Sequence, residues 1–322
     1  MRKARVLAAL VLAAAVGMAA EAPAQGKYPS KAVVLVTHSS AGAGGDVFLR
    51  QLGKHLEPIL GQSVVVENVR GGASAKAVSY VAASPKEGYV LYGSTPTMLQ
   101  TPLLTKTQHD HTDLEPVANV FFDPMILYVR SESPYTSLKA LLAEAKKNPG
   151  KAKWGAATPG SVEHMIVHQV QKEAAVKVIP VTFEGGGDLL VAVLGGHVDL
   201  GIGEPGEVES QVQAGKVRVL TSFTGTRLEG RDWPTAKEEG LDIVVTKFRG
   251  LLGPKGMDKA AIRVWEQAIE KVLEAPAYKA YYESVNLVPA YMGAREYGQY
   301  LGRMNEQLAA YLKEIGVTRK ES

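Results

Sequence analysis

Short runs of β-branched residues alternate with helical patterns along most of this chain of 322 residues. The runs at 33–36, 64–66, 89–92, 125–129, 154–157, 178–183, 198–202 and 217–220 are predicted to be strands. Between them, helical patterns occur over 48–60, 75–83, 138–147, 162–174 and 189–194. This alternation predicts an α/β fold with mostly parallel sheets that carry helices on both faces.

The C-terminal part of the chain has a different pattern, with two long amphipathic helices predicted over 260–273 and 296–315. In the second helix, one stripe contains Tyr297, Tyr300, Leu301, Met304, Leu308, Tyr311, Leu312 and Ile315. Such a stripe is typical of a helix that packs on a core, and we interpret it in that way.

Chain length favours about two domains, because one hydrophobic core seldom serves a chain of this size. No stretch rich in Pro, Gly and Ser divides the sequence cleanly. Two domains without a linker suggest that the chain crosses between them more than once.

Composition excludes several classes of function. The chain has no cysteine, which rules out a disulfide framework, Cys-ligated zinc, an iron–sulfur cluster and a thiol nucleophile. The formal charge is only +3, without a long basic run, which argues against nucleic acid as a main partner. Apolar residues make up 46% of the chain, as in ordinary globular proteins.

The N-terminus has the plan of a secretory signal peptide. Three basic residues, Arg2, Lys3 and Arg5, precede an apolar run over 6–20, and Ala22-Pro23-Ala24 follows. The alternative, a single membrane anchor, needs about 20 apolar residues, which the run does not reach. We expect residues 1–24 to be removed, leaving a periplasmic protein that is not lipid-anchored.

Two glycine-rich loops each follow a strand and open a helix, at 39–46 and 70–76. Backbone N–H groups that converge at a helix N-terminus bind anions. The first loop lacks a dinucleotide fingerprint because Val47 replaces its third glycine, and neither loop has the Gly-Lys-Ser/Thr of a P-loop. The pair predicts an anion site at the sheet edge, although tight turns alone also explain the glycines.

Catalytic motifs are weak. Gly160-Ser161-Val162 lacks the second glycine of a nucleophile elbow. His164 and His168 share a helix face, but the spacing of Glu163 does not make a zinc-protease motif, and we expect packed or solvated histidines. We predict no enzyme activity, no metal and no cofactor.

Motifs spread in order over nearly the whole chain resemble one family. They are Tyr28-Pro29-Ser30-Lys31, the 39–46 loop, 64–68 with its Gly-rich loop, Glu87-Gly88-Tyr89-Val90-Leu91, Trp154-Gly155, Gly160-Ser161 with His164, 183–187, 194–199, 214–220, Pro234-Thr235 with Glu238-Glu239-Gly240, and 249–256. The chain is similar to the extracytoplasmic solute receptors of tripartite tricarboxylate transporters, also called the Bug receptor family.

The resemblance implies a two-domain, clam-like periplasmic binding protein of type II. One domain would comprise 25–123 with 248–322, and the other 124–247. The ligand would be a small carboxylate (mono-, di- or tricarboxylate, or an aromatic one) held in the cleft between the domains. The receptor would be a monomer and would deliver its ligand to a two-subunit integral membrane permease.

The resemblance also implies a set of ligand-binding residues. On the first domain these are Ser40, Ala41, Gly42, Gly44, Gly45, Asp46, Ser74 and Thr95. On the second they are Thr158, Ser161, His164 and Phe183. For Ser161, the alternative is that the hydroxyl only caps a helix.

The sequence departs from the family pattern at this presumed site. Gly45 stands where a hydroxyl residue is usual, Ala75 and Lys76 surround the place of a usual Asn, and His38-Ser39-Ser40 replaces the usual apolar-Phe-Pro. These changes imply either an unusual ligand specificity or a receptor that no longer serves transport. A receptor that feeds a sensor kinase and a secreted α/β hydrolase stay open as alternatives.

Overall fold

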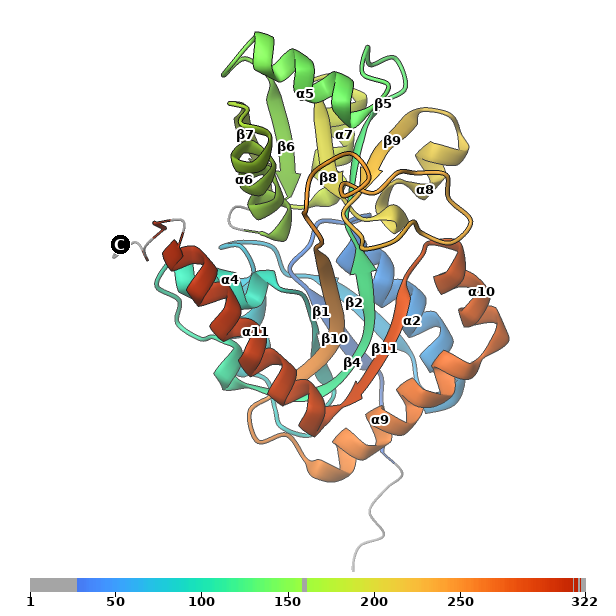
Figure 1. Ribbon diagram of the computed structural model, residues 1–322. Helices are drawn as coiled ribbons and strands as arrows, with labels where there is room; N and C mark the ends of the chain where they lie inside the picture. The colour runs from blue at the N-terminus through green and yellow to red at the C-terminus, as the bar shows by residue number, and fades with distance from the viewer. Residues whose placement is uncertain (1–27, 158–160, 315, 318, 320–322) are drawn as a thin grey trace, which may run out of the picture.

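The computed structural model describes residues 28–157, 161–314, 316, 317 and 319. It consists of two α/β lobes, drawn one above the other in Figure 1, each built on its own sheet. The expected two-lobed α/β architecture is thereby confirmed. The predicted signal peptide and Thr158 lie outside the described residues.

The first lobe contains a six-stranded sheet with the order β11-β4-β10-β3-β1-β2. Its strands are β1 (Val33–Thr37), β2 (Val64–Asn68), β3 (Val90–Ser94), β4 (Leu114–Pro124), β10 (Thr246–Pro254) and β11 (Val288–Gly293). β1 pairs in parallel with β2 and β3. β10 pairs antiparallel with β3 and β4, and β11 pairs antiparallel with β4.

The second lobe contains a five-stranded sheet with the order β7-β6-β8-β5-β9. Its strands are β5 (Ile126–Arg130), β6 (Lys153–Ala157), β7 (Ile179–Phe183), β8 (Leu200–Gly203) and β9 (Val217–Ser222). β6 pairs in parallel with β7 and β8, whereas β5 pairs antiparallel with β8 and β9.

Both sheets are therefore mixed, whereas the sequence predicted mostly parallel sheets. The parallel pairs belong to local strand–helix–strand units, which the alternating pattern reveals. The antiparallel pairs all involve β4, β5 or β10, which adjoin the two passages between the lobes. Because β4 and β5 lead out of the first lobe and β10 leads back into it, β4 and β10 run in opposite directions.

The two passages of the chain between the lobes lie side by side (Figure 1). β4 ends at Pro124 and β5 begins at Ile126, two residues later. The return runs from β9 through a long loop into β10, where Thr246 pairs with Pro124 and Lys247 with Asp123. The two sheets are thus joined through one narrow, two-stranded waist.

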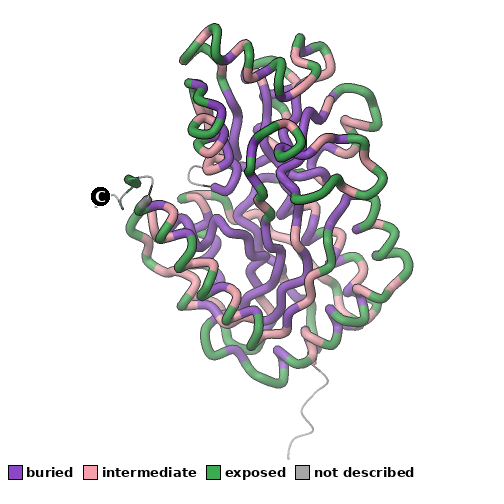
Figure 2. Tube along the Cα trace, viewed as in Figure 1, coloured by how far each residue is buried: buried purple, intermediate pink, exposed green. Residues whose placement is uncertain are grey.

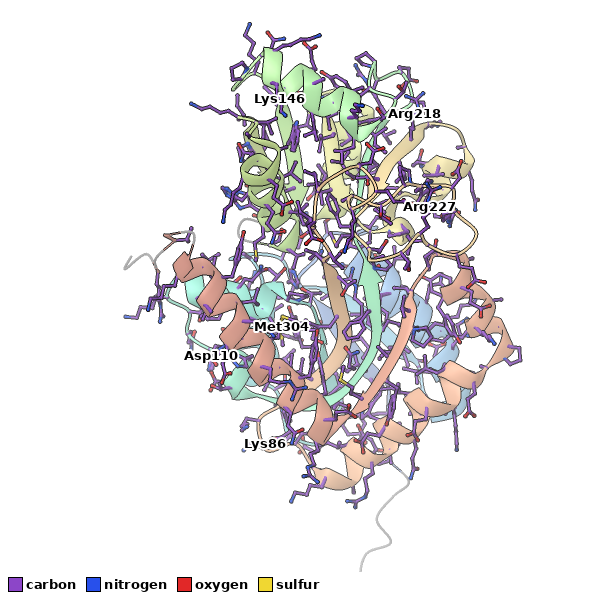
Figure 3. All side chains as sticks on the ribbon, viewed as in Figure 1. Lys86, Asp110, Lys146, Arg218, Arg227 and Met304 are labelled. Atoms are coloured by element: carbon purple, nitrogen blue, oxygen red, sulfur yellow. The ribbon has the colours of Figure 1, made fainter. Side chains whose placement is uncertain are left out.

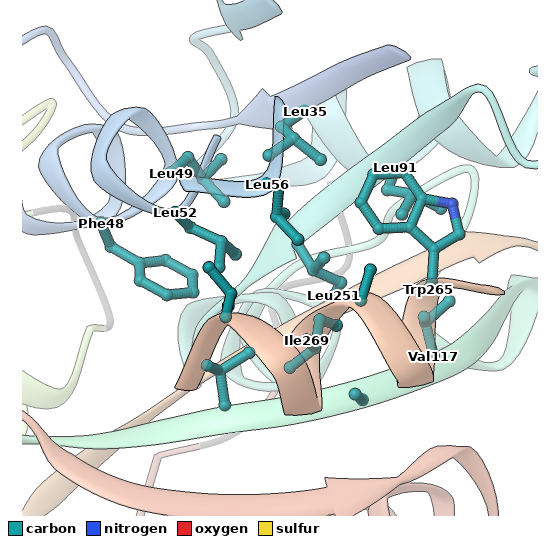
Figure 4. Packing of buried hydrophobic residues seen from close by; sticks show 14 of the residues in the cluster. Leu35, Phe48, Leu49, Leu52, Leu56, Leu91, Val117, Leu251, Trp265 and Ile269 are labelled. Carbon is teal, nitrogen blue, oxygen red and sulfur yellow. The ribbon is translucent and has the colours of Figure 1, made fainter. Parts of the chain in front are cut away.

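Helices cover both faces of the first sheet. On one face lie α2 (Gly44–Leu60), α9 (Lys259–Glu274) and α10 (Pro276–Ser284); on the other lie α3 (Ala75–Ala82), α4 (Thr97–Leu104) and α11 (Ala294–Glu314). Figure 4 shows Phe48 and Leu52 of α2 packed towards Ile269 of α9 in the first of these layers. β1 serves both faces, because its side chains alternate between the two clusters.

The second sheet is covered in the same way. α5 (Leu138–Lys147) and α6 (Val162–Ala174) pack on one face, and α7 (Gly186–Leu194) and α8 (Pro205–Gln213) on the other. Figure 2 shows that the buried part of the chain follows both sheets and continues across the junction of the lobes. Exposed lysines lie at the outer ends, Lys146 on the second lobe and Lys86 on the first (Figure 3).

The described part of the C-terminal stripe packs as predicted, and Ile315 lies outside the described residues. Tyr297, Leu301 and Leu308 of α11 are buried against the first sheet, and Met304 lies beside them (Figure 3). Elements that the sequence did not predict are β4, β10, β11, α4, α8, α10 and a short 3₁₀ turn at His111–Asp113. Within the described ranges, no helix combines the length and the apolar character needed to cross a bilayer.

Candidate ligand-binding site

A small cavity lies between the lobes, where the carboxyl ends of β1, β6 and β8 approach β10. Its volume is about 20 Å³, which holds roughly one water molecule. The first lobe lines it with His38, Gly44 and Gly45 from the β1–α2 loop and with Thr95, and β10, the strand that returns from the second lobe, adds Lys247 and Arg249. The second lobe lines it with Ala157, Glu163, Gly185, Gly186, Glu204 and Glu207.

The N-terminus of α2 binds a carboxyl group of the protein itself. The N–H of Gly44 donates to Oε1 of Glu207 over 2.7 Å, between residues 163 positions apart in the sequence. The other oxygen, Oε2, accepts from the N–H of Glu204 at 3.3 Å, which caps α8. At the place where the sequence predicted an anion site, the start of α2 therefore contacts the carboxyl group of Glu207 from the opposite lobe.

Glycines allow Glu207 to lie there. A Cβ at Gly186, in the first turn of α7, would be 1.9 Å from Oε1 of Glu207. A Cβ at Gly203 would be 2.4 Å from Oε2. The carboxyl group of Glu207 therefore sits where the first turns of α2, α7 and α8 converge.

Behind Glu207 lies a buried ionic cluster that joins the lobes. Lys247 forms ion pairs with Glu163 and Glu204. Arg249 pairs with Asp123 at 2.7 Å and with Glu204 at 2.8 Å. Each of these side chains is at most 7% exposed.

The alternation of side chains along β10 explains why Lys247 and Arg249 both lie in the buried ionic cluster. Lys247 and Arg249 are two residues apart and therefore point to the same face of the strand. Phe248 between them points to the opposite face and packs in the core with Tyr297 and Leu252. The single strand thus anchors itself in the first lobe and presents its two charges to the acids of the second lobe.

The cluster sets the protonation of its acids. Burial alone raises the pKa of Glu204, but the charges of Lys247 and Arg249 bring it down to about 2. Burial raises the pKa of Asp123 to about 6. Burial, and then the negative charge of Glu204, raise the pKa of Glu207 well above its usual value. Glu207 therefore keeps its proton to a higher pH than an ordinary glutamate does.

The first loop lies at the cleft, as the sequence predicted. Gly44 and Gly45 line the cavity, and Ser40 is buried beside the Cα of Gly185 from the other lobe. Ala41 and Gly42 are exposed at the rim. The carboxylate of Asp46 is engaged within its own lobe by the Gly42 N–H, Arg50 and Asn68, so its observed role is to hold the loop.

The remaining first-lobe candidates are also buried. Thr95 lines the cavity, and its Oγ1 accepts from the N–H of Thr97 at 3.3 Å. Ser74 begins α3 with a φ of 85°, in the left-handed region. Arg70, in the same loop, forms a half-exposed ion pair with Asp188 of the second lobe at 2.6 Å. Both glycine-rich loops therefore contact the opposite lobe.

The second-lobe candidates lie near the cleft but serve local structure. Ser161 is the N-cap of α6: its hydroxyl donates to the carbonyl of Ala157 and accepts from the N–H of His164 at 3.4 Å. The rings of His164 and His168 lie 4.9 Å apart. Phe183 packs against the apolar cluster beneath α7. Among the residues described, none of these three lines the cavity.

His38, one of the departures from the family pattern, takes part in the site. Its Nδ1 lies 2.7 Å from the hydroxyl of Tyr92, and the ring is 5% exposed. Burial lowers the pKa of His38 to about 3, so the ring is neutral at ordinary pH. His38 therefore lines the cavity as a neutral polar group and adds no positive charge to those of Lys247 and Arg249.

Sequence reasoning missed the charged half of the site. Its members are Asp123, Glu163, Glu204, Glu207 and Lys247, and Arg249 was recognised only as part of a motif. One signal was available: Lys247 and Arg249 alternate within the mostly apolar run 243–252, which is unusual for a strand unless the charges are paired. Nothing local identifies the acids as their partners.

Comparison with known proteins identifies the family. A model described as the tripartite tricarboxylate transporter family receptor matches residues 48–317. The UPF0065 protein in the gbd 5′ region of Cupriavidus necator is 29% identical over 96% of this chain and 95% of its own length. The protein BugT of Bordetella pertussis is 26% identical over 99% of this chain and its full length.

Solved structures show the same fold. The periplasmic binding protein BugD has a TM-score of 0.86 at 24% identity, covering 91% of this chain and all of its own. The R. palustris protein Rpa4515, with adipate, has a TM-score of 0.87 at 22% identity with the same coverage. MatC of Rhodopseudomonas palustris, with bound malate, has a TM-score of 0.79 at 21% identity, covering 88% and 99%.

The family model covers most of the chain, and the two-lobed fold with a site between the lobes agrees with it. The chain therefore belongs to the tripartite tricarboxylate transporter receptor family, which consists of solute-binding receptors and not of enzymes.

Proposed function

We propose that this protein captures a small carboxylate in the cleft between its lobes and delivers it to a two-subunit membrane permease. One observation carries the proposal: the N-terminus of α2 is buried between the lobes and already holds a carboxyl group through the Gly44 N–H. A site that binds one carboxyl group at this point offers the same donors to another.

Two further observations support the proposal. Lys247 and Arg249 lie behind the α2 N-terminus, so hydrogen-bond donors of two side chains lie near the helix dipole, although acids of the protein already pair with both. Two structural neighbours, Rpa4515 and MatC, were solved with adipate and malate. The shared chemistry of these ligands is a carboxylate on a short chain.

Capture requires the lobes to separate, because the cavity holds little more than one water molecule. The two-stranded waist at 122–124 and 246–250 is the hinge of this movement, with lobes of residues 25–123 plus 248–322 and 124–247. A ligand stabilises the closed state by the contacts that it makes with both lobes at once. No covalent step is needed.

The same proposal includes the cellular setting. Residues 1–24 direct secretion into the periplasm and are removed, and the receptor acts there as a free monomer. The closed pair of lobes is the surface that the permease recognises. Gel filtration with light scattering tests the monomer, and the N-terminal sequence of the secreted protein tests the cleavage site.

Ligand capture is tested by thermal unfolding of the purified protein with acetate, succinate, malate, adipate, citrate and benzoate. A carboxylate present at 100 times its Kd stabilises the folded state by about 2.7 kcal/mol and raises Tm accordingly. Calorimetry then gives the Kd. No shift with any of the six, or recovery of a chemically altered carboxylate, would overturn the proposal.

Delivery is tested separately by uptake of the radiolabelled ligand in cells that carry the permease genes with and without this receptor. Loss of uptake in the absence of the receptor supports transport. Unchanged uptake, with a ligand-dependent change in gene expression that needs the receptor, would instead assign it to sensing.

A further inference from the structure

The contact between Glu207 and Gly44 is more than a helix cap. The capping of α8 uses only Oε2 of Glu207, which accepts from the N–H of Glu204. Oε1 is directed away from its own helix, to the N–H of Gly44 at the start of α2 in the other lobe. The second contact contributes nothing to α8, and its effect is to join the lobes.

The carboxyl group of Glu207 occupies the position that we expect for the carboxylate of a bound ligand. Glu207 is only 7% exposed, and its carboxyl group lies where three helix N-termini converge. It lines the small cavity that holds about one water molecule. The close approach of Gly44, Gly186 and Gly203 leaves no room for a second carboxylate beside it. A carboxylate from solution can reach the Gly44 N–H only after Glu207 has moved away.

One buried oxygen beside the cavity still lacks a hydrogen-bond donor while Glu207 occupies its place. Oε2 of Glu163 accepts no hydrogen bond from the described residues, although the residue is only 1% exposed. Buried acceptors of this kind ordinarily have partners. A ligand in the cleft could donate a hydrogen bond to this unused oxygen.

We propose that Glu207 is an internal ligand of this receptor, which closes the empty cleft and which the carboxylate ligand must displace. This inference rests on the proposed function for the identity of the competing ligand, but the closing role of Glu207 does not. Glu207 thereby sets the threshold for binding: only a ligand whose contacts exceed those of the glutamate occupies the site.

The ligand-free arm of the test measures the closing role. Glu207→Ala removes both contacts, Glu207→Gln keeps one amide oxygen as an acceptor, and Glu132→Gln changes an exposed glutamate of the same lobe as the control. Small-angle scattering is expected to give a larger radius of gyration for Glu207→Ala than for the unmodified protein, an intermediate value for Glu207→Gln, and no change for the control.

A second ligand-free measurement needs no variant and so does not depend on whether the variants fold. Hydrogen exchange at the Gly44 amide of the unmodified protein is expected to be slow, because this N–H is bonded to Glu207 and buried. Fast exchange there, or an unchanged radius in a folded Glu207→Ala protein, would overturn the closing role.

The ligand arm measures competition. With a carboxylate that raises Tm in the six-member panel, Glu207→Ala is expected to lower the Kd by tenfold or more, and Glu207→Gln by less. An unchanged or weaker affinity in the alanine variant would show that Glu207 does not compete. If none of the six carboxylates binds, the proposed function fails, while the ligand-free arm still decides whether Glu207 holds the cleft closed.

Discussion

Arg249 and Glu204 form an ion pair across the junction of the lobes, with 2.8 Å between Nη2 and Oε1 and with both side chains only 2% exposed. The pair is enclosed on one side by Asp123 and on the other by Lys247. Buried pairs of this kind gain little over apolar residues but are costly to break, because a charge is left without a partner.

Replacing Arg249 by Met is therefore expected to lower the free energy of unfolding by about 3–5 kcal/mol, since Asp123 stays buried without its cation. Chemical denaturation measures the change. The control is Arg227→Met, which breaks a half-exposed pair with Glu238 and should have little effect. Equal effects of the two substitutions would contradict the importance assigned to the buried cluster.

Gly44 is predicted to tolerate no side chain. A Cβ there would lie 2.6 Å from Nη2 of Arg249 and 2.9 Å from Oε2 of Glu204, so even Gly44→Ala pushes against the ion pair. We expect a loss of about 1–3 kcal/mol and weaker carboxylate binding. Gly302→Ala on α11, where a Cβ meets nothing within 4 Å, is the control and should be neutral or stabilising. Calorimetric binding at the unmodified affinity in a folded Gly44→Val protein would rule out the close approach of the ligand to this loop.

Ser161 is predicted to act as a helix cap. Ser161→Ala should lower stability by about 1 kcal/mol and leave the Kd for the carboxylate unchanged. Ser137→Ala provides a matched control, because Ser137 caps α5 through the same contact, to the Ala140 N–H at 3.1 Å, on a helix away from the cleft. If Ser161→Ala weakens binding while Ser137→Ala does not, the hydroxyl contacts the ligand.

The pKa of Asp123 predicts a pH dependence. Because burial raises this pKa to about 6, the folded state binds the proton more strongly than the unfolded state does between about pH 4 and 6. The contribution of Asp123 to stability therefore falls as the pH rises through this window. The difference in unfolding free energy between the unmodified protein and Asp123→Asn should decrease from pH 4 to 6 and become level above pH 7. A difference that is flat across the window would contradict the raised pKa.

The unused oxygen of Glu163 predicts a preference among carboxylates. A ligand with a hydrogen-bond donor can satisfy this buried acceptor, whereas a plain carboxylate leaves it unpaired, at a cost of about 1–3 kcal/mol. Succinate, malate and aspartate differ only in the group at C2, which is hydrogen, hydroxyl or ammonium. We expect calorimetry to rank succinate as the weakest, and tighter binding of succinate than of both others would exclude this preference.

Local patterns predicted much of the secondary structure. The ends of α5 and α6 agree with the sequence-based expectation to the residue. β10 was missed because it interrupts an apolar run with Lys247, Arg249 and Gly250, and β11 because Pro289 lies near its start. These strands exist because β4 supplies their partner, an interaction that no local window contains.

The sequence predicted the glycine-rich loop of the candidate site but not the charged residues around it. The glycines of the first loop pointed to an anion site, because a strand, a glycine cluster and a helix follow one another within a few residues. Glu207 and Gly44 are separated by 163 positions, and the sequence around neither residue indicates that they contact each other. The same holds for Lys247 and Glu163, which are 84 positions apart and meet only in the folded protein.

The sequence by itself therefore determined the two-lobed α/β class, the receptor family and the glycine-rich loop that lies at the cleft. Periodicity and backbone conformation depend on near neighbours, and their free energies are expressed within one element or one turn. Only the tertiary structure decided which carboxyl group occupies that loop and which acids accompany Lys247 and Arg249. Burial makes the energy of a charge depend on every group that excludes water from it, and those groups come from both lobes and from distant parts of the chain.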